Sequence, residues 1–124
     1  MSPEPAPPEL VRLASPEAES ARAALPNAEG VEAVIETARA FADPTRLRIS
    51  LALKGAGELC VSDLAWICSI RQNLASHHLR RLRAAALVGS RREGTVILYR
   101  LRPLAVELLG LLVPEPEDPA QGQG

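Results

Sequence analysis

The chain has 124 residues and a formal net charge of −1, a length that suits one compact domain. Its apolar residues are mainly Ala, Leu and Val, with few aromatic ones, which is typical of helices rather than of a β-sandwich. No stretch approaches the roughly 20 apolar residues that span a bilayer, and no secretory signal is recognisable, so we expect a cytoplasmic protein without membrane contact.

The two ends of the chain differ in composition from its middle. Prolines and acidic residues crowd the ends, whereas no proline lies between Pro44 and Pro103. Segments rich in proline and charge bury too little apolar surface to offset the entropy of ordering. We therefore expect three regions: a Pro- and Glu-rich tail over residues 1–28, partly helical near 16–25, a folded domain over 29–112, and an acidic, Pro- and Gly-rich tail over 113–124.

Helical spacing governs the first half of the expected domain. From Glu29 to Phe41 apolar residues recur at intervals of three and four, which places them on one stripe of a helix. Asp43 followed by Pro44 is typical of a helix N-cap with proline in the first turn. This second helix is expected to end at Gly55, because glycine is the usual residue just beyond a helix C-terminus.

Two further helices are expected to lie close together in the chain. A short one over residues 63–68 has Ser62 as its N-cap, and a turn over 69–71 leads into a longer one over 72–85. The longer helix has an apolar side made of Ala75, Leu79 and Leu82, with Leu74 beside it. Its opposite side is polar and consists of Asn73, Ser76, His77 and Arg80.

The apolar period then changes from helical to extended. Residues 88–92 and 95–99 read as two strands, and the Glu93-Gly94 turn between them predicts a β-hairpin. A last helix, beginning at Pro103, is apolar on most of its circumference. Such a helix needs a partner, and a second copy of the chain is the simplest one.

Positive charge is concentrated on one segment of the sequence. Residues 71–102 hold eight arginines and one acidic residue, Glu93, which gives a local formal charge of +7 in a chain whose total is −1. Such a concentration is expected of a surface that binds phosphates. Two helices joined by a short turn and followed by a basic hairpin predict a mainly α-helical winged helix-turn-helix, with about five core helices and a two-stranded wing.

Four collinear segments resemble the ArsR/SmtB family of bacterial metal-responsive repressors. They are ADPTRLRI (42–49), ELCVSDLA (58–65), ASHHLRRLR (75–83) and RREGTVILYRL (91–101). The resemblance covers about residues 30–110. It implies a homodimeric repressor whose first and last core helices form the dimer interface and whose fourth helix enters the major groove of double-stranded operator DNA.

The resemblance and the charge pattern together assign the DNA-binding residues. Side chains expected to reach base edges, where Asn and Gln pair with adenine and Arg with guanine, are Gln72, Asn73, Ser76, His77 and Arg80. Arg71, the last residue of the turn before this helix, is also expected to bind DNA. Arginines expected to neutralise phosphates are Arg81, Arg83, Arg91 and Arg92. For any one of these arginines, a merely solvated surface position is the alternative. His78 is expected to be packed or partly buried.

A metal-sensing site is only half present in the sequence. The resemblance matches Cys60 and Asp63 to metal ligands, but Ser62 stands where the family often has a second cysteine. The segment before Glu29 contains no Cys or His to complete the site, and the family's site on the last helix looks absent. No cofactor is obligatory. The effectors that this chemistry favours are Cd, Pb, Zn or As(III) ions.

The cysteines leave a redox interpretation open. Cys60 and Cys68 are candidates for a thiol-oxidation signal, although a free cysteine such as Cys68 commonly behaves as a small buried apolar residue. Two other readings are an effector-independent regulator and a winged helix that binds protein instead of DNA. An enzyme is not expected, because no nucleophile with its base and no phosphate-binding glycine loop is found.

Overall fold

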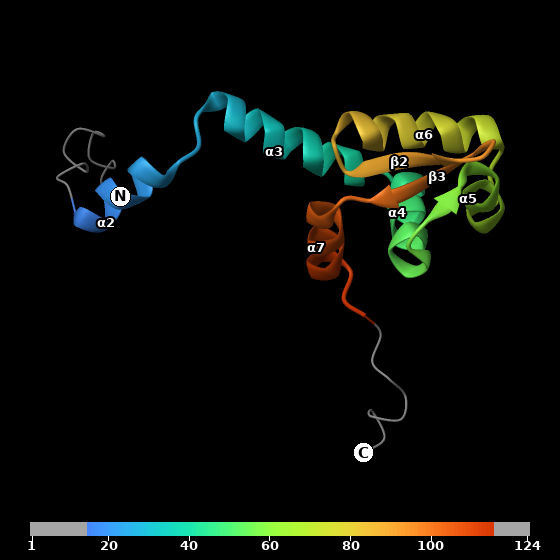
Figure 1. Cartoon of the computed structure of the whole chain (residues 1–124). Helices are drawn as coiled ribbons and strands as arrows, with labels where there is room; N and C mark the ends of the chain where they lie inside the picture. The colour runs from blue at the N-terminus through green and yellow to red at the C-terminus, as the bar shows by residue number, and fades with distance from the viewer. Residues whose placement is uncertain (1–14, 116–124) are drawn as a thin grey trace, which may run out of the picture. The chain divides into compact units, whose positions relative to one another are not determined.

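The computed structural model describes residues 15–115 of the chain. Residues 1–14 and 116–124, which belong to the two expected tails, lie outside the described part. Contacts divide the chain into two compact units, one ending at Ala33 and the other beginning at Val34. The elements, which Figure 1 labels except for β1, are α2 (Pro16–Ala24), α3 (Ala28–Phe41), α4 (Pro44–Ala56), β1 (Leu59–Cys60), α5 (Val61–Cys68), α6 (Gln72–Ala84), β2 (Val88–Glu93), β3 (Val96–Leu101) and α7 (Pro103–Leu112).

The first unit contains α2 and the beginning of α3. Ser15 caps α2 because its hydroxyl accepts a 3.1 Å hydrogen bond from the Ala18 amide. Asn27 does the same for α3, where its side-chain oxygen accepts a 2.8 Å bond from the Gly30 amide. The helix expected near residues 16–25 is therefore present, and every residue of α2 is exposed.

The second unit begins inside α3 and continues through α4. Asp43 caps α4 as expected, since its carboxylate accepts a 2.9 Å bond from the Arg46 amide and Pro44 occupies the first turn. The expected end at Gly55 is wrong. The helix continues to Ala56 and stops at Gly57, whose φ of 90° only glycine adopts at low cost.

The short helix α5 also begins earlier than expected. It starts at Val61 with Cys60 in the N-cap position, so Ser62 is not the cap. Cys60 makes no capping hydrogen bond with its side chain. The helix ends at Ser69, which adopts the left-handed conformation with φ 56° and ψ 47°. That residue makes the tight turn that leads into α6.

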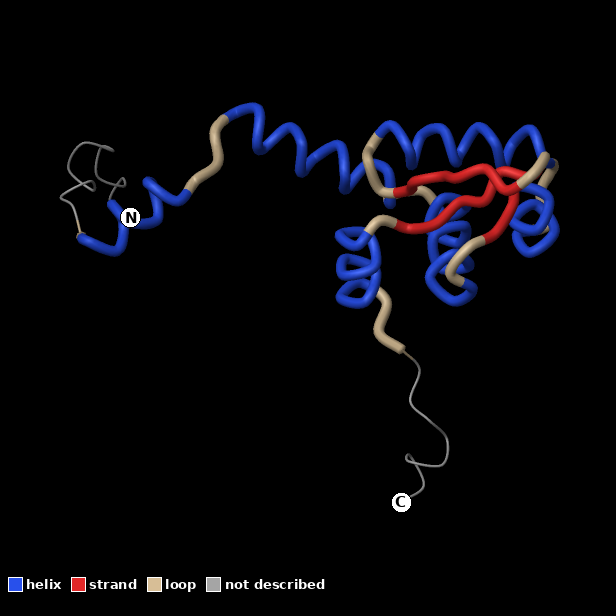
Figure 2. The backbone as a smooth tube through the Cα atoms, in the orientation of Figure 1, coloured by secondary structure: helices blue, strands red, loops and turns tan. Residues whose placement is uncertain are grey.

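A three-stranded antiparallel sheet replaces the two-stranded wing of the sequence prediction (Figure 2). The strand order is β1-β3-β2. The unexpected strand β1 has two residues, with Leu59 opposite Tyr99 and Cys60 opposite Leu98. The hairpin turn also shifts by one residue, because β2 extends to Glu93 and Gly94 supplies the positive φ that a tight hairpin requires.

The core of the second unit lies between the helices and one face of the sheet. Helix α6 packs against β2, whereas α4 and α5 pack against β3. The most deeply buried large side chains are Ile49, Leu53, Leu64, Leu79, Leu82, Leu87, Val88 and Leu109. This arrangement confirms the winged helix-turn-helix fold class. Within residues 15–115, no helix is long and apolar enough to cross a membrane.

Candidate nucleic-acid interface

Helix α6 is held in place by its apolar side. Ala75 and Leu82 have no exposed surface and Leu79 is 1% exposed, as the spacing predicted. Leu74, expected beside this stripe, is instead 42% exposed. Because the inner side of the helix is anchored in the core, the remaining side chains of α6 are directed outward.

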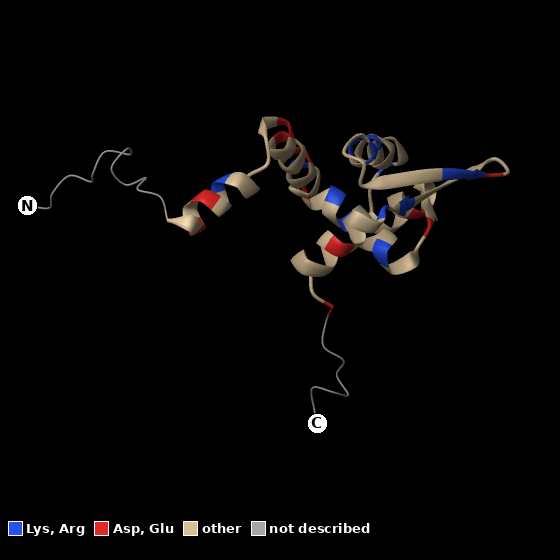
Figure 3. Ribbon diagram, turned by 60° about the vertical axis from the view of Figure 1, so that its left-hand side comes forward, with Lys and Arg blue, Asp and Glu red and all other residues tan. Residues whose placement is uncertain are grey.

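The outward side of α6 is polar and basic, and Figure 3 shows basic residues both here and on β2. Ser76 is half-buried. The other residues expected to contact DNA from this segment are all exposed: Arg71, Gln72, Asn73, His77, Arg80, Arg81 and Arg83. The side-chain oxygen of Asn73 accepts a 2.9 Å hydrogen bond from the Leu74 amide. That bond uses the oxygen that pairing with adenine would require.

A polar cluster lies behind α6 and joins it to two other helices. The Arg46 guanidinium donates to the backbone oxygens of Ala40, at 2.8 Å, and Arg39, at 3.2 Å, which end α3. Its Nη1 lies 3.5 Å from Nδ1 of His78, and an Asp43 carboxylate oxygen lies 4.0 Å from the same nitrogen. His78 is 9% exposed, which confirms that it is packed.

The charges of this cluster favour a neutral histidine. Burial lowers the pKa of His78, and the neighbouring Arg46 and Arg81 add to that effect, although the Asp43 carboxylate opposes it. The pKa of Asp43 is itself lowered, chiefly by the hydrogen bond from the Arg46 amide. A neutral His78 accepts at Nδ1 from the arginine, so the cluster is satisfied without a buried positive charge.

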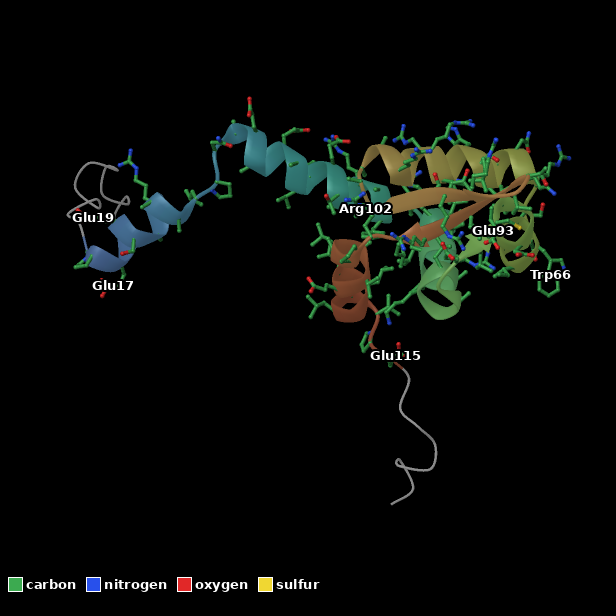
Figure 4. The ribbon with its side chains drawn as sticks, in the orientation of Figure 1. Glu17, Glu19, Trp66, Glu93, Arg102 and Glu115 are labelled. Atoms are coloured by element: carbon green, nitrogen blue, oxygen red, sulfur yellow. The ribbon has the colours of Figure 1, made fainter. Side chains whose placement is uncertain are left out.

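The two wing arginines have different surroundings, although both are exposed. Arg91 Nε and Nη2 donate to the two carboxylate oxygens of Glu58 at 2.7 and 2.8 Å, and Nη2 also donates to Glu93 at 2.9 Å. Glu93 is labelled in Figure 4. The hydrogen bonds from Arg91 lower the pKa of Glu58. No hydrogen bond or ion pair to Arg92 is found in the described part of the chain.

The cysteines occupy different environments, as the sequence suggested. Cys60 is half-buried, and its Sγ lies 3.3 Å from a carboxylate oxygen of Asp63, so this pair of candidate ligands does come together. Cys68 is 2% exposed and belongs to the core. Both thiols are free. Residues 15–115 contain no group of three or more side chains suited to a metal ion, so Cys60 and Asp63 do not fit a closed soft-metal site by themselves.

A second exposed face, formed by α3 and α7, is apolar. A groove of about 530 Å³ lies between these helices, and all its lining residues belong to the second unit: Val34, Thr37, Ala38, Phe41, Ala42, Leu104, Leu108 and Leu112. Leu104 is 55% exposed and Leu112 63% exposed. No residue of the described range 15–115 covers this surface, and exposed apolar surface of this extent is typical of a site where another molecule packs.

Sequence reasoning missed three residues that shape these faces. The sequence gives no sign of the role of Glu58, because its partner Arg91 lies 33 positions away in the chain. The link from Arg46 to His78 joins residues 32 positions apart. Ala86 adopts a φ of 60° between α6 and β2. Its position, just after a helix and just before a strand, was the only signal for that turn.

Comparison with known proteins agrees with this architecture. A model described as a helix-turn-helix domain matches residues 41–91. The arsenic resistance transcriptional regulator ArsR1 of Pseudomonas putida is 40% identical over 65 residues, which are 52% of this chain and 51% of that protein. An HTH-type transcriptional regulator of Methanocaldococcus jannaschii is 39% identical over 71 residues, which are 57% of this chain and 80% of that protein.

A solved structure resembles the fold as well. It is the homodimeric winged helix-turn-helix DNA-binding domain of a possible ArsR-family regulator from Mycobacterium bovis, with a TM-score of 0.65 and 29% identity, covering 73% of this chain and 85% of that one. Fold and surface thus define a winged helix-turn-helix protein. The chain belongs to the ArsR/SmtB family of transcriptional regulators. It spans about half the length of the P. putida relative.

Proposed function

We propose that the protein is a homodimeric transcriptional repressor that binds double-stranded operator DNA with α6 in the major groove. The observation that carries the proposal is the two-sided character of α6. Its inner residues Ala75, Leu79 and Leu82 are buried, whereas its other side carries exposed polar and basic residues from Gln72 to Arg83. A helix so presented matches the dimensions of the major groove and supplies donors for base edges and phosphates.

The roles within α6 follow from exposure. Gln72, His77 and Arg80 are the exposed side chains proposed to reach base edges, with Arg80 suited to guanine. Ser76 and Asn73 belong to the same side of the helix. Ser76 is half-buried and has a short side chain, and the side-chain oxygen of Asn73 already accepts a hydrogen bond from the Leu74 amide. Arg71, Arg81 and Arg83 are proposed to contact phosphates, which orients the helix without reading sequence.

The apolar groove between α3 and α7 supports a second copy of the chain as the other partner. The lining of the groove is almost entirely apolar, which suits a permanent interface better than a transient one. Dimerisation also doubles the number of basic surfaces, so two α6 helices would read two half-sites. The M. bovis relative is a homodimer, which is consistent with this proposal.

A salt series of DNA binding tests the proposal. Binding of the full chain to DNA from its own promoter region should weaken steeply with ionic strength, with a log–log slope that gains about −0.9 for each neutralised phosphate. Arg80→Ala should change the preferred sequence, because it removes a base contact. Undetectable or salt-insensitive binding by the wild-type protein would contradict the DNA-binding function.

We further propose Cys60 as the group through which an effector releases the DNA. The thiol is half-buried beside the Asp63 carboxylate, and Cys60 pairs in the sheet with Leu98 of the wing strand β3. A change at this thiol therefore reaches both the start of α5 and the wing. The P. putida relative is an arsenic resistance regulator, which makes a thiophilic ion the first effector to test.

Release of DNA can be measured with As(III), Cd, Pb or Zn salts and with hydrogen peroxide. At least one of these should release the wild-type protein, whereas Cys60→Ser should stay bound with unchanged affinity for DNA in the absence of effector. Cys68→Ala is the matched control, because that thiol is buried in the core. If none of the agents acts, the proposal that Cys60 senses a thiophilic ion or an oxidant is contradicted. If release persists in Cys60→Ser, another group is the sensor.

A further inference from the structure

The two arginines of the wing lie on opposite faces of the sheet. Neighbouring residues of a strand alternate between faces, and directly opposed residues share one. Val88 is 2% exposed against the core and pairs with the buried Leu101, so the face of Val88 is the one that packs on the helices. Arg92, four residues further on, belongs to this same face. Arg91 lies on the other face, in one row with Leu98 and Cys60.

The contacts of Arg91 leave it little capacity to bind an anion. It forms a two-pronged bond with Glu58 and a third bond with Glu93, so three carboxylate oxygens already surround its guanidinium. Arg100 also lies close enough to lower the pKa of Glu58. Two arginines and two glutamates sum to zero formal charge, so this group offers no net attraction to phosphate.

The position of Glu58 determines what the bridge connects. Glu58 lies between the end of α4 and β1, two residues before the N-cap of α5. Its carboxylate is partly buried, with 30% of the side chain exposed, which makes it a firmer anchor than a fully solvated group. The bridge therefore ties the central part of β2 to the segment that leads into the helix-turn-helix.

Arg92 has the opposite properties. It is exposed, lies on the face of the sheet that packs against the helices, and is without a hydrogen bond or ion pair among residues 15–115. Helix α6 packs against β2. Because Arg92 lies on the side of the sheet that faces the helices, we place it nearer than Arg91 to a duplex docked on α6. An unpaired cation keeps its full charge for phosphate.

We infer that Arg92 is the wing's phosphate contact, whereas Arg91 is a positioning residue that orients the wing through Glu58. The inference rests on the proposed DNA-binding function and divides the wing arginines into two roles. Arg92 contributes directly to the electrostatic part of the binding. Arg91 contributes by holding the hairpin against the segment before α5, so that Arg92 is presented at a constant distance from α6.

The two roles differ in how they affect the salt dependence of DNA binding. A short mixed-sequence DNA duplex is a sufficient probe, because the phosphate term does not depend on sequence. Arg92→Ala should reduce the magnitude of the log–log salt slope by about 0.9 per subunit, the value for one lost phosphate contact. Arg91→Ala should leave the slope at the wild-type value and weaken binding only about two- to fivefold, the range expected of one exposed ion pair.

A charge swap provides a readout that a simple loss of structure would not give. Arg91→Glu alone should weaken binding more than Arg91→Ala, because it places three carboxylates together. Combining it with Glu58→Arg restores the bridge in reverse orientation, and the double variant should recover wild-type affinity within about twofold. Thermal unfolding of each variant checks that the fold is retained.

Three results would overturn the inference: a reduced slope in Arg91→Ala, an unchanged slope in Arg92→Ala, or a charge-swapped variant that stays as weak as Arg91→Glu. Each of these requires that the wild-type protein binds the duplex with a normal salt dependence. Absence of salt-dependent binding in the wild type is a different outcome, because it removes the proposed function itself.

Discussion

The two exposed faces of the second unit differ in what they lack. The face formed by α6 and the wing carries exposed arginines, whereas the face formed by α3 and α7 carries apolar side chains that no residue between 15 and 115 covers. The first is anchored from behind by buried leucines and by the cluster around His78. The difference indicates two kinds of partner, a polyanion for one face and an apolar surface for the other.

The largest effect is expected from placing a charge on the apolar face. Leu104 lines the groove, and Leu104→Glu would put a carboxylate into the proposed dimer interface, where the lining of the groove offers no counter-charge. We expect the variant to be monomeric and to bind DNA on the order of a hundredfold more weakly, because two linked α6 helices bind far better than one. Sedimentation and DNA titration measure both effects.

The matched control for this experiment is Leu111→Glu. Leu111 lies on the same helix and is 82% exposed, but it does not line the groove. This variant should remain dimeric and bind DNA normally. Equal dissociation of both variants would show that the groove has no special role in association.

A substitution just after α6 tests whether the free energy of unfolding can be changed without a change in DNA affinity. Ala86 is strained at a φ of 60°, so Ala86→Gly should raise the free energy of unfolding by about 0.5–1 kcal/mol. DNA affinity should not change, because Ala86 contributes no charge. Urea unfolding provides the measurement.

Ala84→Gly is the corresponding control inside the helix. It lies in the last turn of α6, where glycine should lower the free energy of unfolding by about 0.5–1 kcal/mol. Opposite signs for two alanines two residues apart would isolate the backbone conformation as the cause. A loss of stability in Ala86→Gly would mean that the turn is not strained.

The pH dependence of stability tests the role of His78, which is buried behind α6. Because the pKa of His78 is lower in the folded protein than the ordinary 6.5, folding favours the neutral ring. Stability from this source is complete above pH 6.5 and is lost as the pH falls from 6.5 through the lowered folded value. Urea unfolding of the wild type should show this loss, and His78→Gln should remove it.

The exposed His77 next to it supplies the comparison. His77→Gln should keep the acid-induced loss of stability seen in the wild type. If His77→Gln and His78→Gln have identical pH profiles, burial of His78 behind α6 is not what makes the wild type acid-sensitive.

Periodicity in the sequence was sufficient for the helices and for the inner side of α6. Ala75, Leu79 and Leu82 follow a regular spacing, and the order of helices, turn and hairpin defines the fold. The exact end of a helix was harder to predict where two nearby residues both favour it. Gly55 and Gly57 both favour a helix end, and the helix ends at the second.

The contacts that give each charged side chain its role were beyond sequence reasoning. Arg91 and Arg92 are chemically identical neighbours, and the strand pairing decides which of them meets Glu58. The strand β1 has only two residues, too few for a periodic pattern, and it forms because β3 offers an open edge. Such features depend on residues that are distant in the chain.

Arg46 connects the face formed by α3 and α7 with the face formed by α6 and the wing. Its guanidinium donates to two backbone oxygens near the end of α3 and lies close to the His78 ring on α6. Its backbone amide donates to the Asp43 carboxylate at the start of α4. The side chain therefore links the end of α3, a helix that we propose packs against a second copy of the chain, to α6, the helix that we propose enters the major groove, and so fixes the angle between the two helices. A lysine at this position would keep the charge but lose the link between α3 and α6, because an ammonium group lacks the planar fork that reaches the α3 carbonyls and His78 at once.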